Sequence, residues 1–256
     1  MKKIAIILST ISFLFCSFKT LNVSDNKIRV VVIDAGHGGH DPGCHGSSAK
    51  EKDIALKVAL KTGAMIKKKL PNVKIIYTRD RDVFVELHER SKIANRNGAD
   101  LFISIHCNSA TPAAYGIEVF TMGAHKAEDN VQLALRENAV IEKEKNYKEN
   151  YQGYDPNSPF VRIIIENMQN NFSKQSLDFA SQINTKFNTF VKKSRGVKQA
   201  GFLVLWETTM PSVLIELGFL TNYYEQKKLI SSDYQYKLAN GIADALVSYK
   251  KKVERF

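Results

Sequence analysis

Apolar positions along the chain form short continuous runs that alternate with stripes at helical spacing. The stripes predict helices at 51–69, 85–97, 126–141 and 176–193, and a C-terminal helix around 238–249. The runs predict strands buried on both faces: KIRVVVID (27–34), VKIIYT (73–78), DLFISIH (100–106), GIEVFTM (116–122), FLVL (202–205) and SVLIEL (212–217). This alternation predicts one α/β domain over 27–252, with a mostly parallel twisted sheet of about six strands and helices on both faces.

One long segment breaks this rhythm. Residues 142–175 begin with the polar, turn-rich sequence EKEKNYKENYQGYDPNSP and continue into the short amphipathic piece VRIIIENM. Long excursions in a compact domain are usually functional lids or loops without regular structure. We therefore expect an inserted helical or loop segment at about 142–175.

The N-terminus has the pattern of a secretory signal. Lys2 and Lys3 precede an apolar stretch over 4–15, which is shorter than the roughly 20 residues of a membrane-spanning helix. The pattern predicts a signal peptide at 1–20 and an exported protein of the periplasm or cell envelope. Lipoprotein anchoring through Cys16 stays an alternative, as does an uncleaved anchor.

Composition and charge narrow the class of partner. The hydrophobic share of 44% suits a globular protein, and the net charge is +11. A basic exported protein can be attracted to an anionic wall polymer, although surface lysines also simply solubilise a protein. No nucleic-acid motif is present, so we expect no nucleic-acid partner. Export would permit a disulfide between Cys44 and Cys107, and two separate buried thiols are the alternative.

Candidate chemistry lies where predicted strands end. His37 follows the first strand in VVIDAGHGGHDPG, and His106 ends LFISIH. Ligands of open α/β sheets bind at the carboxyl ends of the strands. Glu216 lies inside SVLIEL, where an acidic side chain is costly to bury unless it is paired or faces a cleft. Each residue alone also has a structural explanation.

Together these stretches resemble a known family. The sequences DAGHGGHDPG, KEKDIAL, SIHCN and IELGFLTN, over about 28–248, are similar to the zinc-dependent N-acetylmuramoyl-L-alanine amidases of the Amidase_3 type. The resemblance implies one Zn²⁺ per chain with His37, Glu51 and His106 as ligands, and Glu216 as the catalytic general base. Two histidines and a carboxylate leave a coordination position open for hydrolysis. Peptidoglycan is the implied partner, and we expect a monomer.

Other residues near these motifs are assigned structural or peripheral roles. Arg79 and Arg90 match arginines of the family pattern and are expected to fix loops. Glu118 and Glu207 are weaker rivals of Glu216. The remaining histidines are expected not to bind the metal: His40, His45, His88 and His125.

The insert has an implied regulatory role. Some amidases of this type carry a helix over the zinc cleft, from which a glutamate fills the open metal position until a protein activator displaces it. The resemblance makes Glu142 and Glu144 the first candidates for that glutamate, followed by Glu149 and Glu166. A surface excursion without regulation is the alternative.

Three other functions are alternatives to an amidase. A different exported zinc hydrolase, either a peptidase or a polysaccharide deacetylase, stays possible, although the HExxH peptidase motif is absent. An inactive wall-binding module would lack one of the four site residues, and all four are present. A phosphate-binding loop at GHGG would need the lysine and hydroxyl of a Walker pattern.

Overall fold

In the computed structural model, the described residues are 27–124, 127–151, 154–168 and 170–255. The expected signal peptide, Cys16 and His125 lie outside them. The strands of the described chain are β1 (Val30–Ala35), β2 (Lys74–Tyr77), β3 (Leu101–Asn108), β4 (Ile117–Met122), β5 (Ser194–Ala200) and β6 (Ser212–Phe219). The helices are α1 (Glu51–Lys69), α2 (Leu87–Arg96), α3 (Glu128–Asn138), η1 (Ala139–Lys143), α4 (Tyr147–Asn150), α5 (Val161–Asn167), α6 (Ser173–Phe187), α7 (Leu203–Trp206), α8 (Tyr223–Ile230) and α9 (Ser232–Val253).

The strands form one six-stranded sheet in the order β2-β1-β3-β6-β4-β5. Neighbouring strands from β2 to β6 are parallel, β4 is antiparallel to β6, and β5 is parallel to β4. The predicted α/β class and mostly parallel sheet are confirmed. The carboxyl ends of β1, β3 and β6 meet at one edge, together with the amino ends of β4 and β5.

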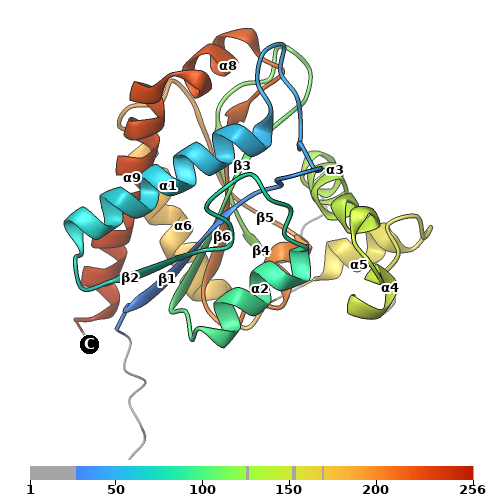
Figure 1. Cartoon of the computed structure of the whole chain (residues 1–256), viewed down its shortest axis with the longest axis horizontal. Helices are drawn as coiled ribbons and strands as arrows, with labels where there is room; N and C mark the ends of the chain where they lie inside the picture. Colours follow the sequence, from blue (N-terminus) through green and yellow to red (C-terminus); the bar gives the residue numbers. More distant parts are fainter. Residues whose placement is uncertain (1–26, 125–126, 152–153, 169, 256) are drawn as a thin grey trace, which may run out of the picture.

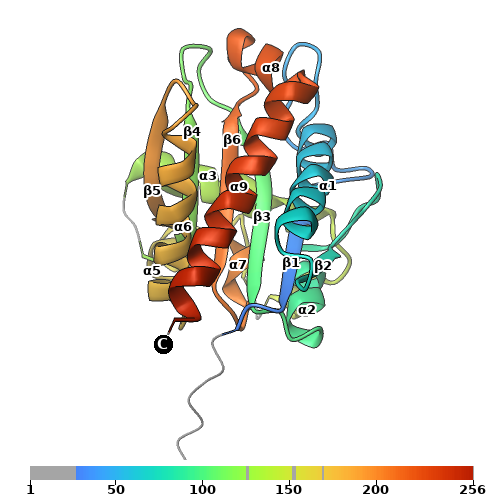
Figure 2. The same ribbon diagram turned by 90° about the vertical axis from the view of Figure 1, so that its left-hand side faces the viewer.

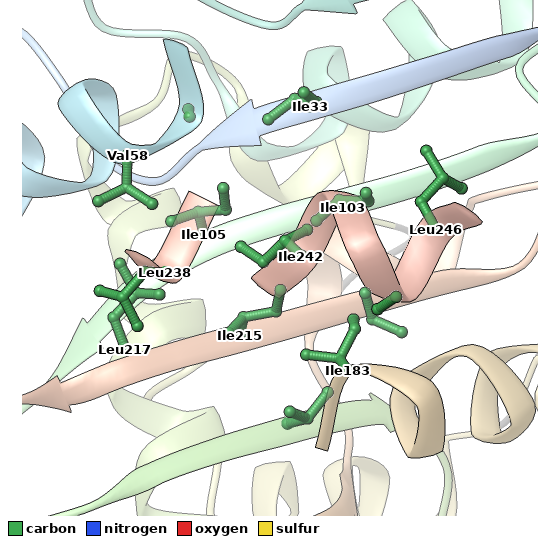
Figure 3. Close-up of a cluster of buried hydrophobic side chains, with 14 of the residues drawn as sticks. Ile33, Val58, Ile103, Ile105, Ile183, Ile215, Leu217, Leu238, Ile242 and Leu246 are labelled. Carbon is green, nitrogen blue, oxygen red and sulfur yellow. The ribbon is translucent and has the colours of Figure 1, made fainter. Parts of the chain in front are cut away.

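Side chains of the central strands alternate between two cores. Ile33, Ile103 and Ile215 pack under α1, α6 and α9, which lie in front of the sheet in Figure 2. Figure 3 shows how the side chains of α9 meet these strands. Phe102 and Leu214 belong to a second core on the opposite face, where α2 and α7 pack. Both faces are covered, so these strands need continuous apolar runs.

Two sequence predictions about the elements are wrong. The run FLVL forms the short helix α7 instead of a strand, because a short buried apolar run does not distinguish the two by periodicity. The missing strand is β5, with the sequence SRGVKQA, which lies at the sheet edge and is mostly half-buried. An edge strand can carry polar and basic residues, so its sequence gave little strand signal.

The long insert forms η1, α4 and α5, which gather with α3 at one side of the sheet edge (Figure 1). Among the described residues, none of the helices combines the length and apolar character that crossing a membrane requires.

Candidate metal centre and active site

A buried ion pair fixes the end of β1. Asp34 is fully buried and accepts hydrogen bonds from Thr78 Oγ1 (2.6 Å), Ser104 Oγ (2.6 Å) and Arg90 Nη1 (2.8 Å). Burial alone would raise the pKa of Asp34, but the Arg90 charge and the two hydroxyls hold it below its ordinary value. Arg90 also donates to the carbonyls of Ala35 and His37. The strand therefore enters the next loop in one fixed position.

His37 lies in that loop with an unusual backbone. Its φ is +59°, in the left-handed region that residues other than glycine rarely adopt. Its Nδ1 lies 2.7 Å from Asp41 Oδ2, and Nε2 points toward Glu51 Oε2 at 3.1 Å. A carboxylate on one ring nitrogen orients a histidine whose other nitrogen binds metal. Asp41 is thus a site residue that the sequence analysis did not identify.

Glu51 begins α1 and is fully buried. Its Oε2 accepts the Cys44 backbone N–H (2.8 Å), and its Oε1 accepts the Cys107 backbone N–H (2.9 Å). Burial would raise the pKa of Glu51, but the neighbouring His37 and His106 hold it well below its ordinary value. The glutamate is therefore an ionised group that is held by the loop before α1 and by strand β3.

His106 ends the apolar part of β3, with its Nδ1 3.0 Å from Glu51 Oε1. Burial alone would lower the pKa of His106, but hydrogen bonds with Glu137 and Glu51 raise it to about 9. The ring lies against the backbone of Gly36, where an added Cβ would meet His106 Cε1 at 2.4 Å. Only glycine leaves room for this imidazole.

A fourth group completes the cluster from α3. Glu137 Oε2 lies 3.2 Å from His37 Nε2 and 3.3 Å from His106 Nδ1, while Oε1 pairs with Arg136 (3.1 Å). Burial and the Glu51 charge would raise the pKa of Glu137, but the two histidines lower it to about 2. One ligand atom from each of these four residues lies within 4.8 Å of the others.

The arrangement fits a divalent cation. Two imidazole nitrogens and two carboxylates are a donor set that Zn²⁺ favours. His37 Nε2 and Glu137 Oε2 are buried and make no hydrogen bond of acceptable geometry, although they lie near each other. Buried polar atoms without a hydrogen bond are costly. Both atoms point toward the same position, where a bound cation would satisfy them.

Glu216 lies beside this cluster on β6. It is the register partner of His106 across parallel strands, so both side chains leave the sheet on the same face. The carboxylate is fully buried, and neither oxygen has a hydrogen-bond partner among the described residues. Burial raises the pKa of Glu216 well above its ordinary value, and the charges of Glu137 and Glu51 raise it further. Such a carboxyl is ready to exchange a proton with a reactant.

The two arginines have structural contacts. Arg79 donates to the carbonyls of Ala35 (2.9 Å), Gly36 (2.7 Å) and Lys52 (2.8 Å), so it connects the His37 loop to α1.

The two rival carboxylates lie outside the cluster. Glu118 pairs with Arg195 (2.7 Å) and Lys198 (2.6 Å). Glu207 is half-buried at the end of α7.

The remaining histidines and cysteines lie outside the cluster. His40 is exposed and stacks on Phe84 with ring centroids 4.1 Å apart, and His45 is exposed. Both thiols are free, and Cys44 Sγ lies 3.1 Å from the Cys107 carbonyl oxygen. Cys44 and Cys107 are therefore two separate thiols in this structure and form no disulfide with each other.

The glutamates expected to reach the metal lie elsewhere. Glu142 is exposed and accepts a hydrogen bond from Asn157 (2.6 Å), while Glu166 pairs with Arg162 (2.7 Å). Glu149 is exposed on α4. Glu144 is buried beside α2. None of these four glutamates lies in the cluster with His37. The further carboxylate of that cluster is Glu137, which precedes the insert on the inner stripe of α3.

Glu144 belongs to a second group of possible ligands, with Glu86 and His88. Its oxygens are already engaged, because Oε1 accepts the Leu87 N–H (2.6 Å) and Oε2 accepts the Tyr151 hydroxyl (2.7 Å). His88 Nδ1 lies 3.4 Å from Oε2. This group is better described as a junction between the insert and α2 than as a metal centre.

Replacing Gly36 by alanine is expected to displace the His106 ring. The new methyl group would overlap the imidazole, and overpacking of this kind costs about 1–3 kcal/mol. We expect the purified variant to hold clearly less zinc per chain than the parent, measured by elemental analysis. Gly98→Ala is the control, since no atom lies within 4 Å of its added Cβ and only its positive φ of +57° is strained. Equal zinc content in the two variants would contradict this geometry.

Known proteins that resemble this chain are cell-wall amidases. The family Amidase_3, described as N-acetylmuramoyl-L-alanine amidase, matches residues 31–248. The N-acetylmuramoyl-L-alanine amidase AmiA of Escherichia coli K12 is 34% identical over 226 residues, which cover 86% of this chain and 76% of that protein. A putative N-acetylmuramoyl-L-alanine amidase of Buchnera aphidicola subsp. Acyrthosiphon pisum is 34% identical over 239 residues, covering 89% of this chain and 97% of the relative.

Solved structures of amidases share the fold. An N-acetylmuramoyl-L-alanine amidase from Clostridium difficile 630 superposes with a TM-score of 0.63 at 29% identity, covering 87% of this chain and 97% of that one. The CwlD amidase from Clostridioides difficile, solved in complex with the GerS lipoprotein, has a TM-score of 0.64 at 26% identity, covering 88% of this chain and 99% of CwlD.

Proposed function

Because this chain belongs to the Amidase_3 family of N-acetylmuramoyl-L-alanine amidases, we propose that it hydrolyses peptidoglycan with one zinc ion held by His37, Glu51 and His106. The bond cleaved is the amide between the lactyl group of N-acetylmuramic acid and the L-alanine of the stem peptide. The observation that carries the zinc assignment is the convergence of these side chains, from the loop after β1, from α1 and from β3, on one buried point.

The residues divide the chemistry between them. When bound, zinc supplies positive charge that acidifies a water molecule and stabilises the oxyanion of the carbonyl under attack. Glu216 takes the proton from that water and passes it to the leaving L-alanine nitrogen. Asp41 keeps the His37 ring oriented through Nδ1 (2.7 Å).

Mass spectrometry of muropeptides tests this function. Purified peptidoglycan is digested with the zinc-loaded protein. We expect intact stem peptides with an L-alanine N-terminus, and glycan strands that keep their acetyl groups. Peptides cleaved within the stem would indicate a peptidase, and deacetylated glycan would indicate a deacetylase. Either product would contradict the proposal.

We also propose that α3 and the insert keep the enzyme inactive at rest. Glu137 Oε2 lies within 3.3 Å of both imidazole nitrogens that face the cluster, so it would occupy the metal position that water or substrate needs. Two further contacts support a closed state. Lys143 pairs with Asp41 (2.5 Å), the carboxylate that orients His37. Glu144 joins the insert to α2 through the Leu87 N–H.

Replacing Glu144 by alanine is expected to raise the basal rate. The change removes the carboxylate that accepts hydrogen bonds from the Leu87 N–H and the Tyr151 hydroxyl. An unsatisfied buried group costs about 1–3 kcal/mol, and this cost destabilises the closed state. We therefore expect dye release from labelled cell walls to rise about 5- to 150-fold. Glu149→Ala is the matched control, because Glu149 is exposed on the same insert. An unchanged rate in Glu144→Ala would argue against the junction.

A protein activator would act on the insert. Phe160, Ile163 and Ile164 are exposed on and beside α5, with 65%, 58% and 41% of their surface accessible. Exposed apolar groups so close together often mark an interaction site. The relative CwlD was solved with a lipoprotein partner, which supports a protein partner here.

We also propose that the protein is exported to the cell envelope, with or without a lipid on Cys16. The sequence at 1–20, which has the pattern of a secretory signal, supports this localisation.

A further inference from the structure

An aromatic groove of about 640 Å³ opens at the same sheet edge as the metal cluster. It lies between the loop that follows β3, the segment before β5 and the start of α8, which meet at the upper end of the molecule in Figure 2. Its principal lining residues are Pro112, Tyr115, Lys192, Tyr223, Tyr224 and Lys228. None of them belongs to the proposed catalytic machinery.

The groove combines exposed rings with cationic side chains. Tyr223 and Tyr224 expose 56% and 75% of their surface, and their rings are 5.6 Å apart in an edge-to-face arrangement. The ammonium of the lining residue Lys192 lies 5.8 Å from the centre of the Tyr115 ring. Two lysines next to the lining also lie over its rings: Lys193 is 4.8 Å from the centre of Tyr115, and Lys227 is 4.5 Å from that of Tyr223. These rings are flat contact surfaces with positive charge beside them.

The acidic residue of the groove is engaged with the backbone. Glu225 lines it, but its Oε1 accepts the Gly116 N–H (3.0 Å) and its Oε2 accepts the Phe219 N–H (2.8 Å). The carboxylate therefore holds backbone in place. The two lysines of the lining, Lys192 and Lys228, outnumber this one carboxylate, so the groove as a whole favours an anionic ligand.

The groove is close to the reaction centre. Thr221, in its lining, follows Glu216 by five residues, which span at most about 18 Å. The loop 109–115 separates the groove from a cavity of about 300 Å³ that is lined by Asn108 and Arg136. Arg136 pairs with Glu137 of the metal cluster. A polymer bound at the cluster would thus reach the groove within a few sugar units.

We propose that the groove binds the glycan strand of peptidoglycan where its stem peptides have already been removed. Hydrolysis breaks the lactyl C–N bond, and water gives its hydroxyl to the carbonyl carbon and a proton to the L-alanine nitrogen. Each cleavage therefore leaves a lactyl carboxylate on the strand. The carboxylates would pair with the lysines, and the sugar rings would pack on Tyr223 and Tyr224. This inference rests on the proposed amidase function and adds retention of the product strand.

Binding measurements on a variant that does not cleave test the proposal. Zinc-loaded protein with Glu216→Gln is titrated with peptide-free glycan strands, with neutral chitin oligosaccharides of equal length, and with a glycerol-phosphate teichoic acid. We expect the tightest binding to the peptide-free glycan, weakened by salt. Tyr224→Ala and the double change Lys192→Ala/Lys193→Ala should each weaken it about three- to tenfold.

Tyr236→Ala is the matched control, because Tyr236 is also exposed (48%), has Lys61 4.9 Å from its ring and does not line the groove. With Glu216 intact, Tyr236→Ala should cleave a soluble muramoyl peptide at the parent rate. Unchanged glycan affinity in Tyr224→Ala, or equal affinity for chitin or teichoic acid, would overturn the groove's assignment. Failure of the parent protein to cleave any muramoyl peptide would instead overturn the amidase function.

Discussion

Replacing Glu216 by glutamine is expected to lower turnover of purified peptidoglycan by roughly 10²- to 10⁴-fold, the range that a general acid–base group contributes. The carboxylate is fully buried on β6, has no hydrogen-bond partner among the described residues, and leaves the sheet on the same face as His106. Glutamine keeps the shape but cannot accept the proton of water. The measurement is the steady-state rate of stem-peptide release.

Two controls make this result specific. Zinc content should be unchanged in Glu216→Gln, since Glu216 is not one of the four clustered ligands. Glu207→Gln, at the end of α7, should keep the parent rate, because that glutamate lies outside the cluster. Parent-level activity of Glu216→Gln would refute the catalytic assignment. Loss of zinc from this variant would show that Glu216 acts on the metal instead.

Replacing Glu137 by alanine is expected to raise the basal rate about 5- to 150-fold, the usual range of coupling between a regulatory element and a site. Its Oε2 lies 3.2 Å from His37 Nε2 and 3.3 Å from His106 Nδ1, and in the proposed closed state it would exclude water from the metal. His37, Glu51 and His106 remain to hold the zinc. The measurement compares rates without any activator protein.

Glu142→Ala is the control for this second prediction. Glu142 lies just beyond α3, is exposed, and pairs with Asn157 away from the cluster. Its replacement should leave the basal rate unchanged. Activation by Glu142→Ala with none by Glu137→Ala would contradict the closed state described here. A loss of zinc together with activity in Glu137→Ala would make Glu137 a permanent ligand rather than a regulatory one.

Much of the fold was predictable because its central strands are buried on both faces. The runs that contain Ile33, Ile103 and Ile215 are continuous and apolar, and such runs have few other structural interpretations. The edge strand β5 was missed because all but one of its residues are only partly buried and need not be apolar. Helix α8 was missed as well, since only Gln226 and Leu229 of its residues are buried.

The metal cluster was only partly predictable. His37, Glu51 and His106 lie in motifs with a strong family resemblance, and the structure brings them together. Glu137 has no such motif. Its one sequence signal is an acidic residue on the inner stripe of α3, which also carries Ala134 and Asn130. Asp41 likewise becomes meaningful only when the loop places it 2.7 Å from His37 Nδ1.

Anomalous diffraction at the zinc edge from crystals of the metal-loaded protein tests the central claim most directly. The account predicts one strong peak bounded by His37 Nε2, His106 Nδ1 and the Glu51 carboxylate, with Glu137 as the fourth neighbour in the resting enzyme. A peak at Glu86, His88 and Glu144 instead, or none at His37, would contradict it.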